Sequence, residues 1–199
     1  MLWADANAVV ESLRRETQLY LPALTRRRGF SSSRIEHLLS RLVQAMPASE
    51  CYLEVGTLEG RTLEAAAHAN DGKTLIGVDP CEKYDAAPDG FGPNVVFMRN
   101  TWQTVLNGPS LLTPVGCAFY DGDHSATETR DFMTALRDFA ADEAVLVLDD
   151  WDRESVREGA FAQSAWRLLR EMPEYTGGLD GPAHHFGYSF GVAVFGYRR

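Results

Sequence analysis

The sequence has few cysteines and no long apolar run. Its three cysteines, Cys51, Cys81 and Cys117, form no C-x-x-C pair, and this odd, scattered set argues against a disulfide framework or a zinc site. No stretch approaches the roughly 20 apolar residues that span a bilayer, and acids at Asp5 and Glu11 argue against a signal peptide. We therefore expect a cytoplasmic protein with free thiols.

Basic residues are also scarce. The 199 residues carry 19 Lys and Arg against 28 Asp and Glu, a formal net charge of -9. An acidic chain repels phosphate backbones and anionic lipid, so we expect no nucleic-acid partner and no membrane surface, but a small molecule. The one basic run, Arg26-Arg27-Arg28, is typical of a solvated helix end. A homodimer is compatible with the sequence, which does not determine the oligomeric state.

Hydrophobic periodicity divides the chain into two parts of one domain, residues 1–199. Residues 1–48 form an N-terminal helical extension, with apolar residues at helical spacing over 6–13 and 35–46. Residues 50–199 alternate short apolar runs with helical segments, and such runs suit strands that are buried on both faces of a parallel sheet. The expected strands are 51–55, 75–78, 95–98, 115–120, 144–148 and 190–197, and the expected helices are 62–69, 125–139 and 155–169.

The last strand has its own signal. It follows a Gly-rich loop, 177–187, with no crossover helix, so it should run antiparallel to its neighbour. The predicted fold is therefore α/β, a doubly wound and mostly parallel sheet with a final antiparallel strand and N-terminal helices.

Glycines and acids follow the predicted strands at their carboxyl ends, where open parallel sheets bind ligands. Glu54-Val55-Gly56-Thr57 with Gly60 ends the first strand, and the glycines let the backbone approach a ligand closely. Asp79 ends the second strand about 20 residues later, where a carboxylate can accept bonds from both ribose hydroxyls. The pair favours adenosine binding over the alternative, a tight turn and a turn acid before Pro80.

The fourth and fifth strands end in further acids. Their exits read Tyr120-Asp121-Gly122-Asp123-His124-Ser125 and Val147-Leu148-Asp149-Asp150-Trp151. Acids at three strand exits on one edge concentrate more charge than folding alone needs. The alternative is that these residues cap the helices that follow, since Ser125-Ala126-Thr127-Glu128 has the form of a capping box.

Over about residues 50–155 these motifs resemble the class I methyltransferases that use S-adenosylmethionine (SAM). The D-G-D-H-S exit resembles a bacterial branch near the macrocin-type sugar O-methyltransferases and, more distantly, the catechol type. The resemblance implies a Rossmann-like fold and O-methylation of a small molecule. It also implies roles for residues at the strand exits: Glu54, Gly56, Thr57 and Gly60 line the methionine part of SAM, Asp79 holds the ribose, Asn100, Thr101 and Trp102 border the adenine, and Asp121 lies under the sulfonium.

In the metal-dependent members, the resemblance implies a divalent ion held by Asp121, Asp149 and Asp150. Three carboxylates suit Mg²⁺ or Ca²⁺, and a site without metal is the alternative. His124, three residues after Asp121, occupies the position of the catechol branch's general base, and these two residues are the catalytic candidates. Histidine is also common at this position in relatives without demonstrated activity. The alternative for Asp123, His124 and Ser125 is that they cap the helix that follows.

Two alternatives to a methyltransferase remain. One is a non-catalytic SAM-binding or interaction domain. The other is a nucleotide-dependent oxidoreductase, against which the incomplete glycine fingerprint argues. Two loops, Tyr84 to Pro93 and the one with His184-His185, could cover the ligands, with ordinary packing or solvent exposure as the alternative.

Overall fold

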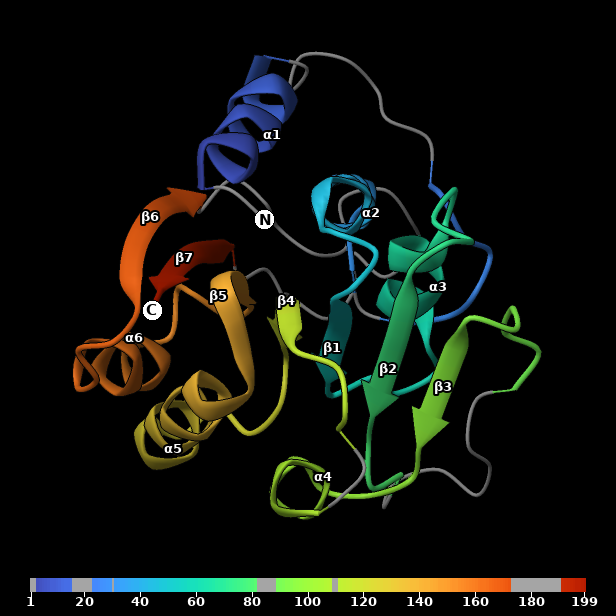
Figure 1. Ribbon diagram of the computed structural model, residues 1–199. Coiled ribbons are helices and arrows are strands. Elements are labelled where there is room, and N and C mark those ends of the chain that lie inside the picture. Colours follow the sequence, from blue (N-terminus) through green and yellow to red (C-terminus); the bar gives the residue numbers. More distant parts are fainter. Residues whose placement is uncertain (1–2, 16–22, 30, 82–88, 109–110, 173–190) are drawn as a thin grey trace.

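The computed structural model describes residues 3–15, 23–29, 31–81, 89–108, 111–172 and 191–199. In this part of the chain, six helices and seven strands follow one another (Figure 1). In chain order the elements are α1 (Trp3–Arg15), α2 (Ser33–Ala45), β1 (Cys51–Val55), α3 (Arg61–Ala67), β2 (Thr74–Val78), β3 (Val95–Met98), α4 (Trp102–Asn107), β4 (Val115–Tyr120), α5 (Ala126–Phe139), β5 (Ala140–Leu148), α6 (Glu154–Phe161), β6 (Arg167–Met172) and β7 (Val192–Arg198).

The strands form one sheet in the order β3-β2-β1-β4-β5-β7-β6. β1 to β5 pair in parallel, whereas β7 lies antiparallel between β5 and β6. The predicted doubly wound sheet with a final antiparallel strand is therefore confirmed. Strand order reverses between β1 and β4, and such a switch point opens a crevice at the carboxyl ends of the strands.

Helices cover both faces of the sheet (Figure 1). Residues such as Leu39 of α2 pack with Tyr52 on one face, in a cluster that also includes side chains of α1 and α3. On the other face, α5 and α6 pack over the sheet, and Phe132 of α5 belongs to the same cluster as Leu146 of β5. Successive strand residues point to opposite faces, so each buried strand contributes to both clusters. The N-terminal helices thus share their core with the sheet.

The helix expected over 155–169 is a prediction that the structure corrects. α6 ends at Phe161, whose side chain is exposed, and the two leucines expected on its apolar face lie in β6 instead. Leu168 packs into the cluster below α5 and Leu169 into the cluster below α1 and α2. Consecutive residues on opposite faces require a strand. The pairing of β6 with β7 decides the structure here, and local periodicity does not reveal that pairing.

The basic run was also interpreted wrongly. Residues 23–29, which we call the strap, lead irregularly toward α2 and end no helix; Arg26 and Arg28 are exposed and Arg27 is half-buried. All three cysteines are free and buried, as expected. Among the described helices none is long and apolar enough to cross a membrane. The predictions for Tyr84, His184 and His185 fall outside the described residues.

Candidate active site

Backbone strain gathers at the carboxyl edge of the sheet. Leu58 after β1, Cys81 after β2 and Asp150 after β5 have φ of 48°, 53° and 52°. The Cβ atom makes this left-handed region unfavourable for residues other than glycine, at a cost of roughly 1–3 kcal/mol for each residue. Three separate connections adopt it at one edge, so the surrounding packing holds this edge in shape. Strain of this kind is typical of ligand-binding sites.

Gly56 brings the exits of β1 and β4 into contact. Its φ is 85°, and a Cβ at this position would lie 1.8 Å from the carbonyl oxygen of Asp121, so only glycine fits. Beside this contact is a small pocket between the glycine turn, the first turn of α3, the β4 exit and the strap. Its lining residues are Gly29, Gly56, Thr57, Leu58, Arg61, Thr62 and Asp121.

Glu54 lies below this turn with its side chain fully enclosed. Its carboxylate accepts hydrogen bonds from the Tyr52 hydroxyl at 2.7 Å and the Thr62 hydroxyl at 2.9 Å. Burial raises the pKa of Glu54 to about 8, because removing the carboxylate from water outweighs these two bonds. Glu54 is thus a buried residue that links β1 to α3 by hydrogen bonds, next to the pocket lining. Gly60 is the N-cap of α3 and has φ 83°.

Asp79 ties the β2 exit to the glycine turn. Its two carboxylate oxygens accept backbone N–H bonds from Leu58 at 2.8 Å and from Cys81 at 2.6 Å. Both donors are residues with strained backbone, so Asp79 stabilises two strained connections at once. Each carboxylate oxygen has a second lone pair, and the side chain is only partly buried. The turn role that the sequence offered as the alternative is present, and it leaves acceptor capacity for a ligand.

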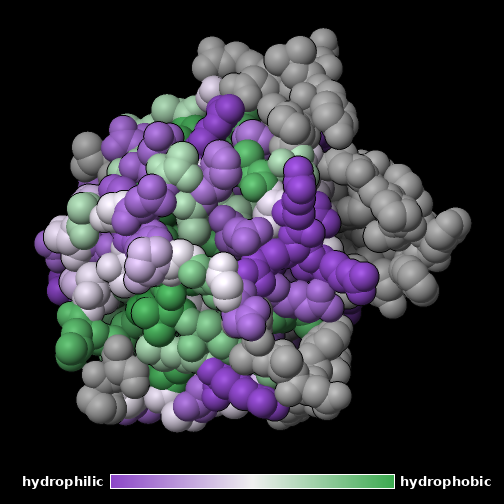
Figure 2. Space-filling model, turned by 90° about the vertical axis from the view of Figure 1, so that its right-hand side faces the viewer, coloured by the Kyte–Doolittle hydropathy of each residue, from purple (hydrophilic) through white to green (hydrophobic). Residues whose placement is uncertain are grey.

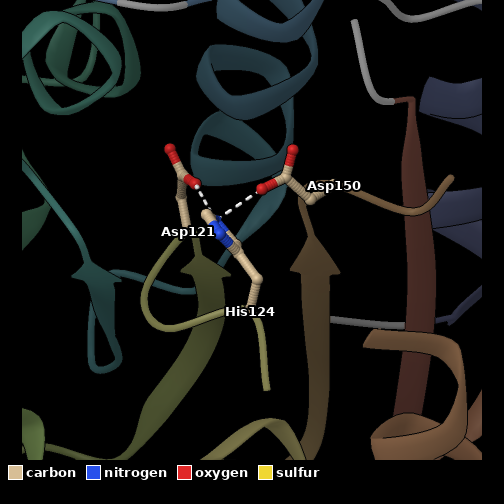
Figure 3. Close-up of side chains that lie close together, drawn as sticks. All are labelled: Asp121, His124 and Asp150. Atoms are coloured by element: carbon tan, nitrogen blue, oxygen red, sulfur yellow. Dashed lines mark ion pairs between the residues drawn. The ribbon is translucent and has the colours of Figure 1, made fainter. Parts of the chain in front are cut away.

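Asp121, His124 and Asp150 converge beside this pocket (Figure 3). His124 Nε2 lies 3.6 Å from Asp121 Oδ1 and in closer contact with Asp150 Oδ2. Asp150 is almost fully buried and also pairs with Arg153 at 3.3 Å. Since Asp121 also lines the pocket, it connects the two parts of the site.

Electrostatics in this cluster favour a charged histidine. The neighbouring carboxylates of Asp121 and then of Asp150 raise the pKa of His124 to about 9, against the opposing effect of its partial burial. Burial raises the pKa of the Asp121 carboxyl, and the nearby Asp150 charge raises it further while His124 lowers it. An imidazolium between two carboxylates is therefore the form at neutral pH when no other cation is near.

The ligand geometry differs from the set that the resemblance implied. In the described part of the chain, ligand atoms of Asp121, His124 and Asp150 lie within 4.8 Å of one another, and Asp149 does not belong to this group. Asp149 instead accepts the backbone N–H of Asp150 at 2.9 Å. Burial, followed by the charge of Asp121, raises the pKa of Asp149 well above its ordinary value. Two carboxylates and one imidazole nitrogen fit a divalent transition metal such as Mn²⁺.

Capping accounts for the neighbours of His124. Asp123 accepts the Ser125 N–H at 2.8 Å, and the Ser125 hydroxyl oxygen accepts the Glu128 N–H at 3.3 Å at the start of α5. The capping alternative is thus right for Asp123 and Ser125. His124 turns away from the helix toward Asp150 on the neighbouring strand exit (Figure 3).

The residues expected around adenine follow β3. Asn100 and Thr101 are exposed. Thr101 caps α4, with its Oγ1 accepting the Thr104 N–H at 3.4 Å, and Asn100 Oδ1 accepts the Thr101 N–H at 2.9 Å. Trp102 packs edge-on against Phe132 at 5.6 Å, and its indole N–H donates to Glu128 on α5 at 3.0 Å. The Trp102 ring is thus held by α5 and half-buried.

Four residues of the pocket lining were not candidate site residues in the sequence: Gly29, Leu58, Arg61 and Thr62. Arg61 opens α3, where a cation is disfavoured by the helix dipole unless an acid compensates it. Its partner is the fully buried Glu36 of α2, at 2.7 Å from Arg61 Nε. A cation at a helix start was the available signal, but the partner lies 25 residues away in the chain and only the fold reveals it.

Comparison with known proteins agrees with this geometry. A family model described as a methyltransferase domain matches residues 53–151, from β1 to the β5 exit. No curated protein matches the chain. The chain is similar to three solved structures: the cofactor-bound Rv0187 from MTB (16% identity, 99% of this chain and 89% of that chain covered, TM-score 0.65), the O-methyltransferase TomG from Streptomyces achromogenes in complex with SAM (15%, 96% and 90%, 0.64) and the O-methyltransferase from Bacillus cereus in complex with SAH (14%, 98% and 91%, 0.59).

The matched residues carry each motif on which the resemblance rests: the glycine turn, Asp79, the D-G-D-H-S exit and the paired acids after β5. The fold similarity to these structures extends over nearly the whole chain. Residues 53–151 are therefore a methyltransferase domain, in a chain whose fold is that of SAM-dependent methyltransferases.

Proposed function

We propose that this protein transfers the methyl group of SAM to a hydroxyl oxygen of a small molecule. The observation that carries the proposal is the position of Asp121, which lines the glycine-turn pocket and also contacts His124. A histidine thus lies beside the pocket that we assign to the donor. The structurally similar proteins TomG and the Bacillus cereus enzyme are O-methyltransferases, which supports oxygen as the acceptor atom.

The donor side fits the residues at the first two strand exits. We assign the pocket lined by Gly56, Thr57 and Leu58 to the methionine part of SAM. Asp79 is already fixed by two backbone N–H groups, so its carboxylate is oriented before the ribose arrives. Prior orientation reduces the conformational entropy lost on binding.

On the acceptor side, little chemistry is required of the protein. SAM supplies an activated methyl group, so the protein aligns the acceptor and removes one proton. We assign proton removal to His124, whose basicity Asp121 and Asp150 increase. A ligand or cation that neutralises these carboxylates lowers the pKa of His124 and releases its proton.

A divalent metal fits Asp121, His124 and Asp150 as ligands. A metal there would lower the pKa of an acceptor hydroxyl and orient it. If His124 is a ligand, proton removal passes to water or to a carboxylate. The two roles of His124 therefore exclude each other in one complex.

Calorimetry with SAM and S-adenosylhomocysteine tests the donor assignment. We expect both to bind, and Asp79→Ala to weaken binding by about 2–3 kcal/mol, because a charge-assisted bond pair to the ribose is lost. Asp71→Ala, at an exposed turn before β2, is the matched control and should bind as the wild type does. Absence of SAM binding to the wild type at millimolar concentration would remove the proposal.

Turnover then separates an enzyme from a binding protein. A panel of phenolic and sugar hydroxyl compounds is incubated with SAM, and S-adenosylhomocysteine release is measured. Release with at least one acceptor, reduced about 10²–10⁴-fold in His124→Ala with SAM affinity retained, supports O-methylation with His124 as base. SAM affinity without turnover on any acceptor supports the non-catalytic alternative.

A further inference from the structure

The strap contributes a wall to the pocket at the glycine turn. Gly29 lines this pocket together with Gly56 and Leu58. Gly29 has φ 146°, and a Cβ on it would lie 2.8 Å from the Cβ of Arg61, so the strap backbone packs directly on the first turn of α3. Any side chain at position 29 would push the strap away from the pocket.

Two acids anchor the strap, Glu36 of α2 and Glu64 of α3. At its start, the Leu24 N–H donates to Glu36 at 2.7 Å, and Glu36 also pairs with Arg61. Arg61 in turn donates to the Gly29 carbonyl oxygen at 3.2 Å. Glu36 has no exposed side-chain surface, and burying a carboxylate is costly unless donors and a cation surround it. The pair therefore joins α2, the strap and α3 into one unit.

Arg27 forms the second anchor. Its Nε lies 3.0 Å from Glu64 Oε1 on α3, and the Thr25 hydroxyl donates to the other oxygen of the same carboxylate. The guanidinium also contacts the carbonyl oxygen of Asp89 and lies 4.1 Å from the centre of the Phe91 ring. A cation over an aromatic face is attracted to it. Arg27 thus connects the strap to α3 and to the chain segment that leads to β3.

The Arg27 side chain is less exposed to solvent than the side chains of its neighbours in the strap. Arg26 and Arg28, its neighbours, are exposed, whereas 20% of the Arg27 side chain is exposed. Exposed ion pairs contribute little to stability, but a partly buried guanidinium with an acid, a carbonyl and a ring around it holds its segment in one place. Figure 2 views the side of the molecule that carries β3 and the strap, where hydrophilic side chains gather next to apolar ones.

We propose that Arg27, Glu64 and the Glu36–Arg61 pair are positioning residues for the donor pocket: they hold the strap so that Gly29 closes the pocket over the methionine part of SAM. The proposal rests on the proposed function, because it takes SAM as the ligand of this pocket. None of these four side chains need take part in methyl transfer. Their effect is on donor affinity, through the position of the strap.

The test measures SAM affinity and strap mobility together. In Arg27→Met the side chain keeps its length and loses its charge, so we expect faster amide hydrogen exchange in residues 23–29 and SAM binding weakened at least tenfold. Arg130→Met is the matched control, since Arg130 on α5 is half-exposed and pairs with its neighbour Asp131. The control should leave exchange in the strap, SAM affinity and melting temperature as in the wild type.

A charge exchange separates positioning from loss of folding. Arg27→Glu and Glu64→Arg should each weaken SAM binding, and the double variant should bind SAM more tightly than either single variant, because the pair is restored in reverse. Failure to fold would not produce such recovery. A double variant as weak as the sum of the singles overturns the role of this pair.

The outcomes distinguish this proposal from the proposed function. If the wild type binds no SAM, the proposed function fails and the strap proposal fails with it. If the wild type binds SAM and Arg27→Met binds it equally well, with exchange in the strap increased, only the strap proposal is overturned. Unchanged exchange in Arg27→Met overturns the anchor itself.

Discussion

Glu54 shows how a single residue can link the site to stability. Its folded-state pKa of about 8 exceeds the ordinary value of about 4.3. The folded state therefore holds this proton more tightly than the unfolded chain, and the contribution of Glu54 to stability is full below about pH 4. It is lost as the pH rises toward 8, because ionisation then favours the unfolded chain.

Glu54→Gln should make stability less dependent on pH. The amide keeps the size of the side chain and can still bond with the Tyr52 and Thr62 hydroxyls. Since one pKa unit corresponds to about 1.4 kcal/mol, we expect the wild type to lose on the order of 2–4 kcal/mol more than the variant between pH 5 and 8. Urea unfolding at each pH measures this difference.

The control for this measurement is Glu158→Gln, at an exposed position on α6, which should follow the wild-type curve. Parallel curves for the wild type and Glu54→Gln would show that Glu54 does not bind its proton more tightly in the folded state. Asp121 and Asp149 also have raised pKa values, so a smaller decline should remain in the variant.

A metal titration decides between two ligand sets. The sequence predicts Asp121, Asp149 and Asp150, whereas the structure groups Asp121 with His124 and Asp150. If Mn²⁺ binds, a 100-fold excess over Kd stabilises the fold by about 2.7 kcal/mol, or roughly 5–10 °C in melting temperature. His124→Gln and Asp150→Asn should reduce this shift, and Asp149→Asn should retain it.

The converse pattern, with the shift retained in His124→Gln and lost in Asp149→Asn, would support the set implied by the resemblance. Addition of EDTA should reverse the shift in either case. No shift with Mn²⁺ or Mg²⁺ in the wild type would leave the site without metal, with His124 paired to the carboxylates alone. Melting temperatures from scanning fluorimetry provide the measurement.

At the scale of elements, the sequence predicted most of what lies at the sheet edge. Gly56, Asp79, Asp121 and Asp150 follow strands whose apolar runs are buried on both faces. In a parallel sheet all such exits meet at one edge, so knowing the strands suffices to bring these residues together. That local rule explains why the candidate site could be located from the chain alone.

Elements determined by distant partners could not be predicted in this way. β6 exists because β7 pairs with it, and a leucine pair such as Leu168-Leu169 suits a helix or a strand equally well. The strap is held by Glu36 and Glu64, which lie on α2 and α3. His124 was placed at the right strand exit, but its contact with Asp150 depends on the neighbouring exit. Side-chain direction within a loop has no periodic signal.

At the scale of the whole molecule, the N-terminal helices and the sheet share one core. Leu13 of α1 is fully buried in the same cluster as Phe119 of β4 and Val194 of β7. Polar contacts reinforce this on α2, where Ser40 donates to the His68 carbonyl oxygen and accepts, through its own carbonyl, a bond from Asn70. A helical extension that shares its core in this way should not unfold by itself.

We therefore expect residues 1–199 to unfold in one cooperative transition, with coincident curves from far-UV circular dichroism and tryptophan fluorescence. Leu13→Ala should shift this whole transition, at a cost of about 2–5 kcal/mol, because a cavity forms beneath α1. Leu112→Ala, at a side chain that is 90% exposed, should change stability by less than about 0.5 kcal/mol.

Separate transitions from the two probes, with Leu13→Ala moving only the earlier one, would show that the N-terminal helices form an independent unit. In that case mild denaturant would unfold α2 and release the strap while the sheet stays folded. SAM affinity would then decline before the sheet unfolds. Coincident loss of SAM binding and of structure is the result that the shared core predicts.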